Sequence, residues 1–538
     1  MVLSAAALGL SVVASSFGLL QPAFASTPPP IAPVVKTSDG PVVGAFDRGV
    51  AEFLGVPYAA TTAGANRWRP PQPIERSSTP LSTTSFAQPC AQTAQAGPAS
   101  DNENCLALNI YAPRTLRGKH PVLVFLHGGA NTGGSSNAYT ANLMPARTGA
   151  VVVGVNYRLG FLGFGALPGL NAENSHGSSG NYGLLDQQAA LRWIKRNIAS
   201  FGGDPREVTL FGQSAGAIDT IDQLVSPEAK GLFERAISES LVGPGATETL
   251  DQATADSIAA INRADEPPPN GVDLGCPTTV SPAALVACLR AASIAKLATI
   301  ASPGPIIDGY VVPRQPIEAF ASGHFNHVPV VLGSNHDEGT LLFFVSSSVP
   351  SQAAFDSAIG ERFGAANEAA IVSRYPARRY RGSFTQALAA AVGDALIACN
   401  TEAFRRVISP YVPTYGYEFN QLNPALLLPV SSAPGIIQGD THTSELAYVF
   451  GFSARGALGP SDLALSKKFM TYWVRFAQSG DPNVPMSQHA SGIDRLPKWH
   501  LYHGRRPMLL SLGTPVEPES VASFDAVHNC EFWNARLG

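Results

Sequence analysis

Short runs of apolar, β-branched residues recur along the chain at intervals that leave room for helices between them. Continuous apolar runs of this length are typical of strands that are buried on both faces of a sheet. They predict strands at 107–111, 121–126, 151–156, 207–211, 233–238, 328–333 and 414–419. Residues 186–200 and 461–479 carry apolar side chains at helical spacing and are followed by Gly, Asp and Pro. The alternation indicates an α/β protein with a large, mostly parallel central sheet flanked by helices.

The composition narrows the classes of function. The 538 residues are 45% hydrophobic and include 26 Phe, which excludes a disordered chain. Thirty-six Lys and Arg against 40 Asp and Glu give a formal net charge of −4. The chain therefore has no excess of basic residues that would support binding to nucleic acid or to an anionic membrane. No linker or repeat divides the chain after residue 30, so we predict a single domain over residues 33–538.

The N-terminus has the pattern of an export signal. Residues 1–25 contain no charged side chain and run through apolar residues to Ala23-Phe24-Ala25. This predicts a signal peptide cleaved after Ala25, followed by a Pro-rich arm at 26–32. A basic segment at the start is missing, which indicates either a misplaced start codon or, as the alternative to cleavage, an N-terminal membrane anchor. With cleavage, we expect a mature chain without a membrane span, secreted to a bacterial periplasm or the extracellular space.

Six cysteines, an even number, suit an oxidising compartment. None forms a C-x-x-C motif of the kind that binds zinc or performs redox chemistry. Spacing favours two short loops and leaves one long-range pair, although fifteen connectivities are formally possible. The favoured pairs are Cys90–Cys105, Cys276–Cys288 and Cys399–Cys530.

A candidate nucleophile lies directly after the strand at 207–211. Gly212-Gln213-Ser214-Ala215-Gly216 is a G-x-S-x-G motif, and a helical pattern resumes after it. In this strand–turn–helix context the sharp turn needs small neighbours and presents Ser214 at a helix N-terminus. A second glycine-rich turn, residues 127–130, follows the strand at 121–126. Its small residues leave backbone N–H groups free to bind a substrate oxyanion.

These motifs and several ordered stretches resemble the type-B carboxylesterase family, which includes cholinesterases and bacterial para-nitrobenzyl-type esterases. The supporting stretches are 53–59, 103–109, 156–160, 181–187, 333–339, 442–446 and 530–533. The resemblance implies an α/β-hydrolase fold with a small N-terminal β-sheet and with helical and loop insertions around an active-site gorge. It also implies carboxylic-ester hydrolysis without a cofactor, and the same three cysteine pairs.

A serine nucleophile needs an imidazole base, which in turn needs a carboxylate to orient it. In α/β-hydrolases the chain order is serine, acid, histidine. That order leaves five histidines open: His442, His489, His500, His503 and His528. The resemblance selects His442 as the base and Glu338 as the acid. Asp337 and Asp440 are the alternative acids.

The resemblance assigns the oxyanion donors to the backbone N–H groups of Gly129, Ala130 and Ala215. It further implies two structural ion pairs, Arg67 with Glu103 and Arg158 with Asp186. We expect no metal site. The histidine pairs with helical spacing have no third ligand motif beside them; they are His324 with His327 and His500 with His503.

The expected substrate is a small carboxylic ester. Residues 91–104 contain no aromatic side chain to bind a quaternary ammonium, so choline esters are not expected. Two other functions stay open: a catalytically inactive binding or adhesion module with the esterase fold, and a hydrolase of amides, polyesters or lactones. The oligomeric state is left undetermined.

Overall fold

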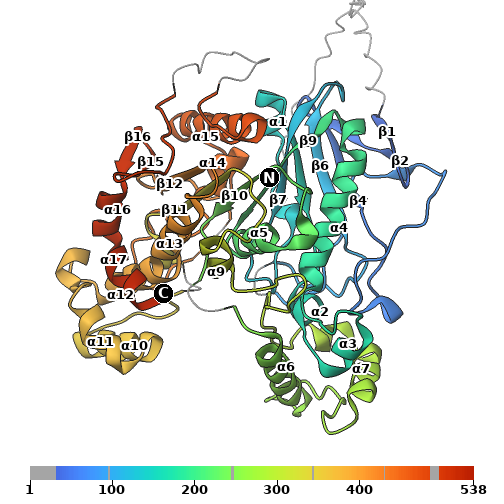
Figure 1. The fold of residues 1–538 in the computed structure, drawn as a ribbon, viewed down its shortest axis with the longest axis horizontal. Coiled ribbons are helices and arrows are strands. Elements are labelled where there is room, and N and C mark those ends of the chain that lie inside the picture. The colour runs from blue at the N-terminus through green and yellow to red at the C-terminus, as the bar shows by residue number, and fades with distance from the viewer. Residues whose placement is uncertain are drawn as a thin grey trace, which may run out of the picture.

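The computed structural model describes residues 32–94, 97–243, 247–341, 344–428, 431–484 and 496–537. The expected signal peptide at 1–25 and almost all of the Pro-rich arm lie outside these ranges. Within them, the largest sheet has 11 strands in the order β16-β15-β12-β11-β10-β9-β7-β8-β6-β4-β3 (Figure 1). Neighbours from β15 to β8 are parallel, and the pairs at both edges are antiparallel. The predicted large, mostly parallel sheet is confirmed.

The strands of this sheet are β3 (Ala45–Asp47), β4 (Val50–Pro57), β6 (Ala107–Pro113), β7 (His120–Leu126), β8 (Val151–Val155), β9 (Gly203–Gln213), β10 (Arg235–Glu239), β11 (Val330–Asn335), β12 (Thr414–Asn420), β15 (Met508–Gly513) and β16 (Val516–Ser520). A small N-terminal sheet contains β1 (Val34–Thr37), β2 (Gly40–Val43) and β5 (Leu81–Ser82), and a short hairpin contains β13 (Phe452–Ser453) and β14 (Gly456–Ala457).

The helices are α1 (Leu143–Thr148), α2 (Gly160–Phe164), α3 (Pro168–Glu173), α4 (Tyr182–Asn197), α5 (Ala215–Val225), α6 (Leu250–Asp265), α7 (Pro282–Ala291), α8 (Ile294–Leu297), α9 (Pro316–Ala321), α10 (Gln352–Phe363), α11 (Ala365–Val372), α12 (Phe384–Gly393), α13 (Cys399–Ile408), α14 (Leu446–Phe450), α15 (Pro460–Ser479), α16 (Val521–His528) and α17 (Cys530–Leu537). Helices α6 and α7 project at one end of the sheet and α10 and α11 at another (Figure 1).

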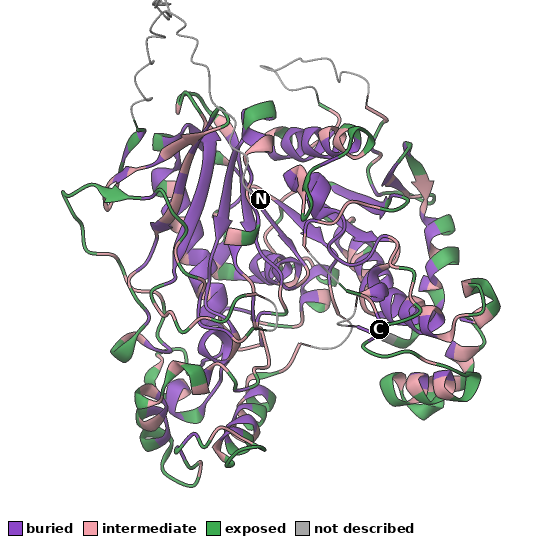
Figure 2. Ribbon diagram, turned by 180° about the vertical axis from the view of Figure 1, so that it is seen from behind, coloured by how far each residue is buried: buried purple, intermediate pink, exposed green. Residues whose placement is uncertain are grey.

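Alternate side chains of the central strands enter two different cores. In β7, Val122, Val124 and Leu126 pack in a cluster with residues of α4 and α5. Leu123 and Phe125 point the other way, into a cluster with residues of α14 and α15. The strands are buried through the middle of the molecule, and exposed residues gather at its rim (Figure 2). Burial on both faces explains why these strands are almost continuously apolar.

All seven predicted strands are present, with boundaries that differ by a few residues. The largest shift is in β9, which begins at Gly203 rather than 207 because Gly203 pairs with His120 of β7. The helix expected at 186–200 is α4, which begins at Tyr182, and its last turn is a 3₁₀ helix, Ile198–Phe201. The Gly-Asp-Pro segment after it therefore opens a strand as well as ending the helix.

Among the described residues, one helical run, Phe384–Ile408, is long and apolar enough to cross a membrane by length and composition. It comprises α12, a π-helical turn (Asp394–Ala398) and α13. Within the fold, 72% of its most apolar window is buried. Such burial is typical of the core helix of a globular domain.

Disulfide bonds join Cys90 to Cys105, Cys276 to Cys288 and Cys399 to Cys530. The first two close loops with sequence separations of 15 and 12, and the third spans 131 residues. This last bond ties the start of α13 to the start of α17. It therefore fixes the C-terminal helices against the body of the protein.

Two buried ion pairs connect loops to the core. The guanidinium of Arg67 contacts both carboxylate oxygens of Glu103, at 2.8 and 2.7 Å, and its third nitrogen donates to carbonyls at the end of α7. Arg158 contacts Asp186 in the same two-point manner, at 2.7 Å for each bond. At Arg67 and Glu103, only 8% and 9% of the side-chain surface is exposed. Water can therefore do little to replace a lost partner.

We expect Glu103→Gln to lower the free energy of unfolding by about 3 to 5 kcal/mol, because it leaves the Arg67 charge buried without its counter-ion. The matched control is Glu173→Gln, which breaks a two-point contact to Arg290 that is partly exposed. There the loss should stay within about 1 kcal/mol. Urea unfolding of the two variants measures the difference, and equal stabilities would contradict the assigned role of Glu103.

Candidate active site

Ser214 occupies a strained turn between β9 and α5. Its backbone has φ +58° and ψ −121°, and its N–H donates to the carbonyl of Glu239 at 3.0 Å. The flanking glycines permit a very close approach. A Cβ on Gly212 would lie 2.2 Å from the carbonyl oxygen of Gly216, and one on Gly216 would lie 2.0 Å from that of Leu126. Both positions of the motif thus require glycine, and the turn presents a half-buried serine at the start of a helix.

Glu338 and His442 meet in the interior, next to this turn. Nδ1 of His442 lies 2.6 Å from Oε2 of Glu338, and the other carboxylate oxygen accepts the backbone N–H of Asn335 at 2.7 Å. Only 4% of the histidine side chain and 1% of the glutamate side chain are exposed. The carboxylate is therefore held at both oxygens, and it fixes the proton of His442 on Nδ1.

The alternative acids lie elsewhere. Asp337 and Asp440 contact each other across the two loops: the N–H of Asp337 donates to the Asp440 carbonyl at 3.1 Å, and the N–H of Asp440 donates to Oδ2 of Asp337 at 3.2 Å. Burial is the largest cause that raises the pKa of Asp440, to about 9, with repulsion from Asp337 adding to it. These residues clamp the loops that carry Glu338 and His442, and in the described residues neither contacts the imidazole.

The remaining histidine candidates divide into three groups. His528 is buried and contacts Asp394 and Glu418 instead of the serine turn. His500 and His503 lie at the surface, partly or fully exposed. His489 lies outside the described residues. Of the four candidates that the structure describes, His442 is the one that lies beside Glu338 and the residue before Ser214.

That neighbouring residue, Gln213, was not recognised from the sequence as part of the site. Its side-chain Nε2 lies 3.2 Å from Nε2 of His442. A donor at this distance requires a lone pair on the ring nitrogen, which is the state of a base. The ring of Phe344 meets the same imidazole edge-on, with 5.3 Å between centroids. The middle positions of G-x-S-x-G are variable, so the motif itself carried no signal for Gln213.

A glycine-rich turn lies against the serine. A Cβ on Gly128 would stand 3.0 Å from Cβ of Ser214. Gly129 and Ala130 both have positive φ, +120° and +55°, and Ala130 is exposed. In the hydrogen bonds found within the described ranges, the N–H groups of Gly129, Ala130 and Ala215 donate to no protein acceptor. These three amides are therefore available to a substrate oxygen.

Buried side chains hold this turn in shape. Asn131, which also has positive φ, donates through Nδ2 to Asp219 of α5 at 2.8 Å. Gln187 of α4 contacts the second oxygen of Asp219 at 2.5 Å. The hydroxyl of Tyr157 lies 2.7 Å from the carbonyl of His127, and the two rings stack. In the sequence, this support is indicated only by the two acidic residues, Asp219 and Asp222, in the apolar helix that follows the motif.

Two more buried carboxyl groups lie near the pair. Glu445 accepts a bond of 2.5 Å from Asn335, and Glu239 accepts one of 2.8 Å from the indole of Trp473. Burial, followed by repulsion from Glu338, raises the pKa of Glu445 to about 7. Burial also raises the pKa of Glu239 well above its usual value. Both shifts favour the neutral forms of these two groups and so oppose the build-up of negative charge beside His442.

Comparisons with known proteins show the family of the chain. A family model described as the carboxylesterase family matches residues 31–533. The chain belongs to the carboxylesterase family. Similar curated proteins include carboxylesterase 1C of Rattus norvegicus, which is 33% identical over 88% of this chain and 89% of the relative. Liver carboxylesterase of Sus scrofa is 34% identical over 94% of this chain and 93% of its own length. Fumonisin B1 esterase of Sphingopyxis macrogoltabida is 34% identical over 86% of this chain and 85% of the relative.

As a carboxylesterase, the protein is a carboxylic-ester hydrolase with the α/β-hydrolase fold. Both of these predictions from the sequence are confirmed. The alternative of an inactive adhesion module has no support from the relatives named above. The finer likeness to bacterial para-nitrobenzyl-type esterases stays a prediction.

In this carboxylesterase, we expect Gln213→Glu to move the acid limb of the pH profile of kcat/KM upward by about 1 pH unit or more. A carboxylate next to the imidazole favours its protonated form, which cannot act as a base. The control Gln252→Glu makes the same charge change on the exposed face of α6 and should leave the profile in place. An unchanged profile for Gln213→Glu would show that its side chain does not reach His442.

Proposed function

We propose that this carboxylesterase is a serine hydrolase that works through an acyl-enzyme, with Ser214 as nucleophile, His442 as base and Glu338 as the group that orients the base. The observation that carries the proposal is the 2.6 Å contact between buried Glu338 and Nδ1 of His442. It leaves Nε2, beside the residue that precedes Ser214, unprotonated and able to accept the serine proton.

The reaction begins when Oγ of Ser214 attacks the carbonyl carbon of the ester and its proton moves to Nε2 of His442. The oxygen of the tetrahedral intermediate accepts hydrogen bonds from the N–H groups of Gly129, Ala130 and Ala215. His442 then protonates the departing alcohol, which leaves an acyl group on Ser214. Water, deprotonated by the same nitrogen, attacks this acyl-enzyme and releases the acid.

We propose small-molecule carboxylic esters as the substrate class. Two of the relatives are named for the general activity, and the bacterial one is named for a single compound. Amides, lactones and polyesters share the same carbonyl chemistry. A panel of chromogenic acyl esters, anilides, lactones and polymer films ranks these classes by kcat/KM, and the proposal requires the esters to rank first.

We further propose that the protein is exported after cleavage near Ala25. Three disulfides support an oxidising compartment, where such bonds persist. The apolar, uncharged residues 1–25 supply the signal.

We expect Ser214→Ala to lower kcat/KM by at least about 10⁴-fold, because the variant keeps the amides and the base but has no nucleophile. Ser175→Ala, a change of the same size on the exposed surface, is the control and should keep full activity. In the unmodified enzyme, stopped-flow mixing with a chromogenic ester should give a burst of alcohol close to one equivalent if deacylation is slow. Full turnover by Ser214→Ala would refute the assigned nucleophile.

For export, mass spectrometry of protein recovered from outside the cytoplasm should give a chain that begins at Ser26. Replacing both Ala23 and Ala25 by bulky residues should leave the precursor unprocessed, because small residues at these positions define the cleavage site. A recovered chain that retains residues 1–25 would favour the membrane anchor instead.

A further inference from the structure

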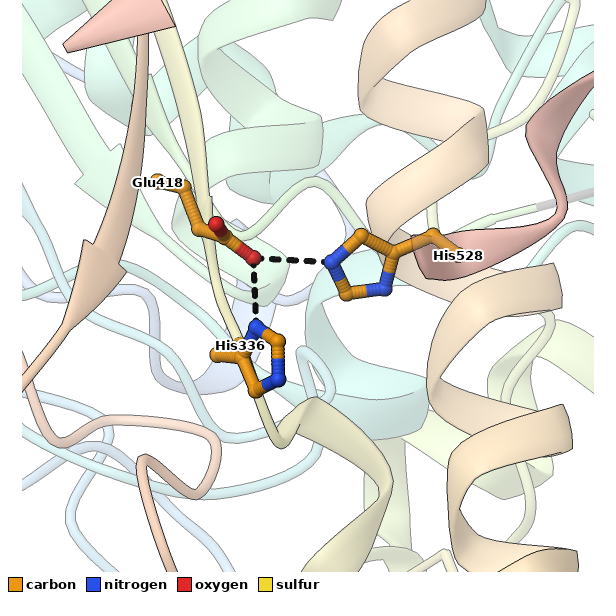
Figure 3. Close-up of side chains that lie close together, drawn as sticks. All are labelled: His336, Glu418 and His528. Atoms are coloured by element: carbon orange, nitrogen blue, oxygen red, sulfur yellow. Dashed lines mark hydrogen bonds and ion pairs between the residues drawn. The ribbon is translucent and has the colours of Figure 1, made fainter. Parts of the chain in front are cut away.

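A second cluster of ionisable side chains lies on the far side of the Glu338 turn. His336 follows β11, Glu418 belongs to β12, and His528 ends α16. Nδ1 of His336 and Nε2 of His528 each lie 2.8 Å from the same oxygen, Oε1 of Glu418. Figure 3 shows the two imidazole rings pointing at this carboxylate from different directions. One potential ligand atom from each of the three residues lies within 4.8 Å of the others.

We propose that His336, Glu418 and His528 form a binding site for one divalent transition metal ion of the Zn²⁺ class. Two imidazole nitrogens and a carboxylate are a donor set that suits such ions. In a tetrahedral site with bonds of about 2.0 to 2.2 Å, ligand atoms stand about 3.3 Å apart. The present 2.8 Å spacings are shorter than this, so metal binding requires each imidazole to move about 0.5 Å away from Oε1 of Glu418.

The surroundings of His528 resemble the support that metal-binding histidines have. Its other nitrogen, Nδ1, lies 2.5 Å from Oδ1 of Asp394, so Nε2 is directed at the cluster. The second oxygen of Asp394 accepts the hydroxyl of Tyr375 at 2.8 Å, and Trp533 donates to that hydroxyl at 2.7 Å. A carboxylate that holds the far nitrogen of a histidine fixes its tautomer and raises its strength as a ligand.

The cluster is rigid on one side and open on the other. Glu418 lies in the sheet between β11 and β15, and the disulfide from Cys399 to Cys530 anchors the chain two residues after His528. Side-chain exposure is 2% for Glu418 and 3% for His528, but 34% for His336. An ion can therefore enter past His336 and retain a water molecule on that side.

The charge balance also favours a cation. In the ion pairs of the described ranges, Glu418 and Asp394 have only imidazole partners, with no arginine or lysine. A further carboxyl group, Glu519 of β16, contacts Glu418, and one of its oxygens is buried without a hydrogen-bond partner. A divalent ion would take the place of the protons that these carboxylates hold on the two imidazoles. The three ligands are 82 and 110 residues apart, which explains why no sequence motif indicated them.

The test uses the untagged full chain, freed of metal by chelation, and Co²⁺ as a spectroscopic probe of the site. We expect one Co²⁺ per chain with visible d–d absorption, displacement by Zn²⁺, and an apparent Tm that rises with Zn²⁺ concentration. His336→Gln and His528→Gln should each weaken Co²⁺ binding at least about 10-fold, and Asp394→Asn about 10- to 100-fold. His324→Gln removes an exposed histidine elsewhere and should change nothing.

His336→Gln decides the outcome if the buried substitutions fail to fold, because His336 is partly exposed and circular dichroism can verify its fold. Absence of stoichiometric Co²⁺ binding by the unmodified chain would overturn the proposal. So would equal affinity in His336→Gln. In that case the three residues are an ion network that is complete without a metal. Ser214→Ala should bind Co²⁺ as the unmodified chain does, which separates this result from the esterase mechanism.

Discussion

The backbones of β7, β9 and α5 come together around Ser214 more closely than any side chain would allow. The Cβ distances of 2.0 and 2.2 Å at Gly216 and Gly212 measure how close this approach is. A non-glycine residue held at positive φ, as Ser214 is, costs of order 1 to 3 kcal/mol. The sheet offsets that cost through two cores packed on its opposite faces. The position of the nucleophile therefore depends on the packing of the whole sheet.

A second requirement is that charge near the imidazole be limited. Glu338 is held by one backbone N–H and by His442, so its carboxylate cannot rotate away from the ring. Glu445 lies behind it. Its raised pKa favours the neutral carboxyl group at pH values where an ordinary glutamate is already charged. The amides of the glycine-rich turn are directed by Asn131 and Asp219. Orientation and charge are thus both set by buried residues around Ser214 and His442.

The sequence was informative where a constraint is local or periodic. Continuous apolar runs located the parallel strands, and the glycines around Ser214 located the turn. Strand β16 was not predicted, because Val516–Ser520, with Glu and Pro at an antiparallel edge, lacks the apolar run of a buried strand. Gln213 and the cluster around Glu418 were also missed. Their roles arise from contacts between segments more than 80 residues apart, and no local pattern records such contacts.

The contact between Asp337 and Asp440 has a consequence for how such enzymes diversify. It closes the chain on itself across 103 residues, directly beside the acid and the base. The entropy of closing a loop grows only slowly with its length, by about 0.6 kcal/mol for each doubling. The peripheral helices α10 and α11 lie in this interval, and a longer exposed turn beside them would add little to this entropy. The exposed faces of α10 and α11 are therefore where the enzyme's outer surface can change, whereas Phe355, Ile359 and Ile371 must keep their packing in the core.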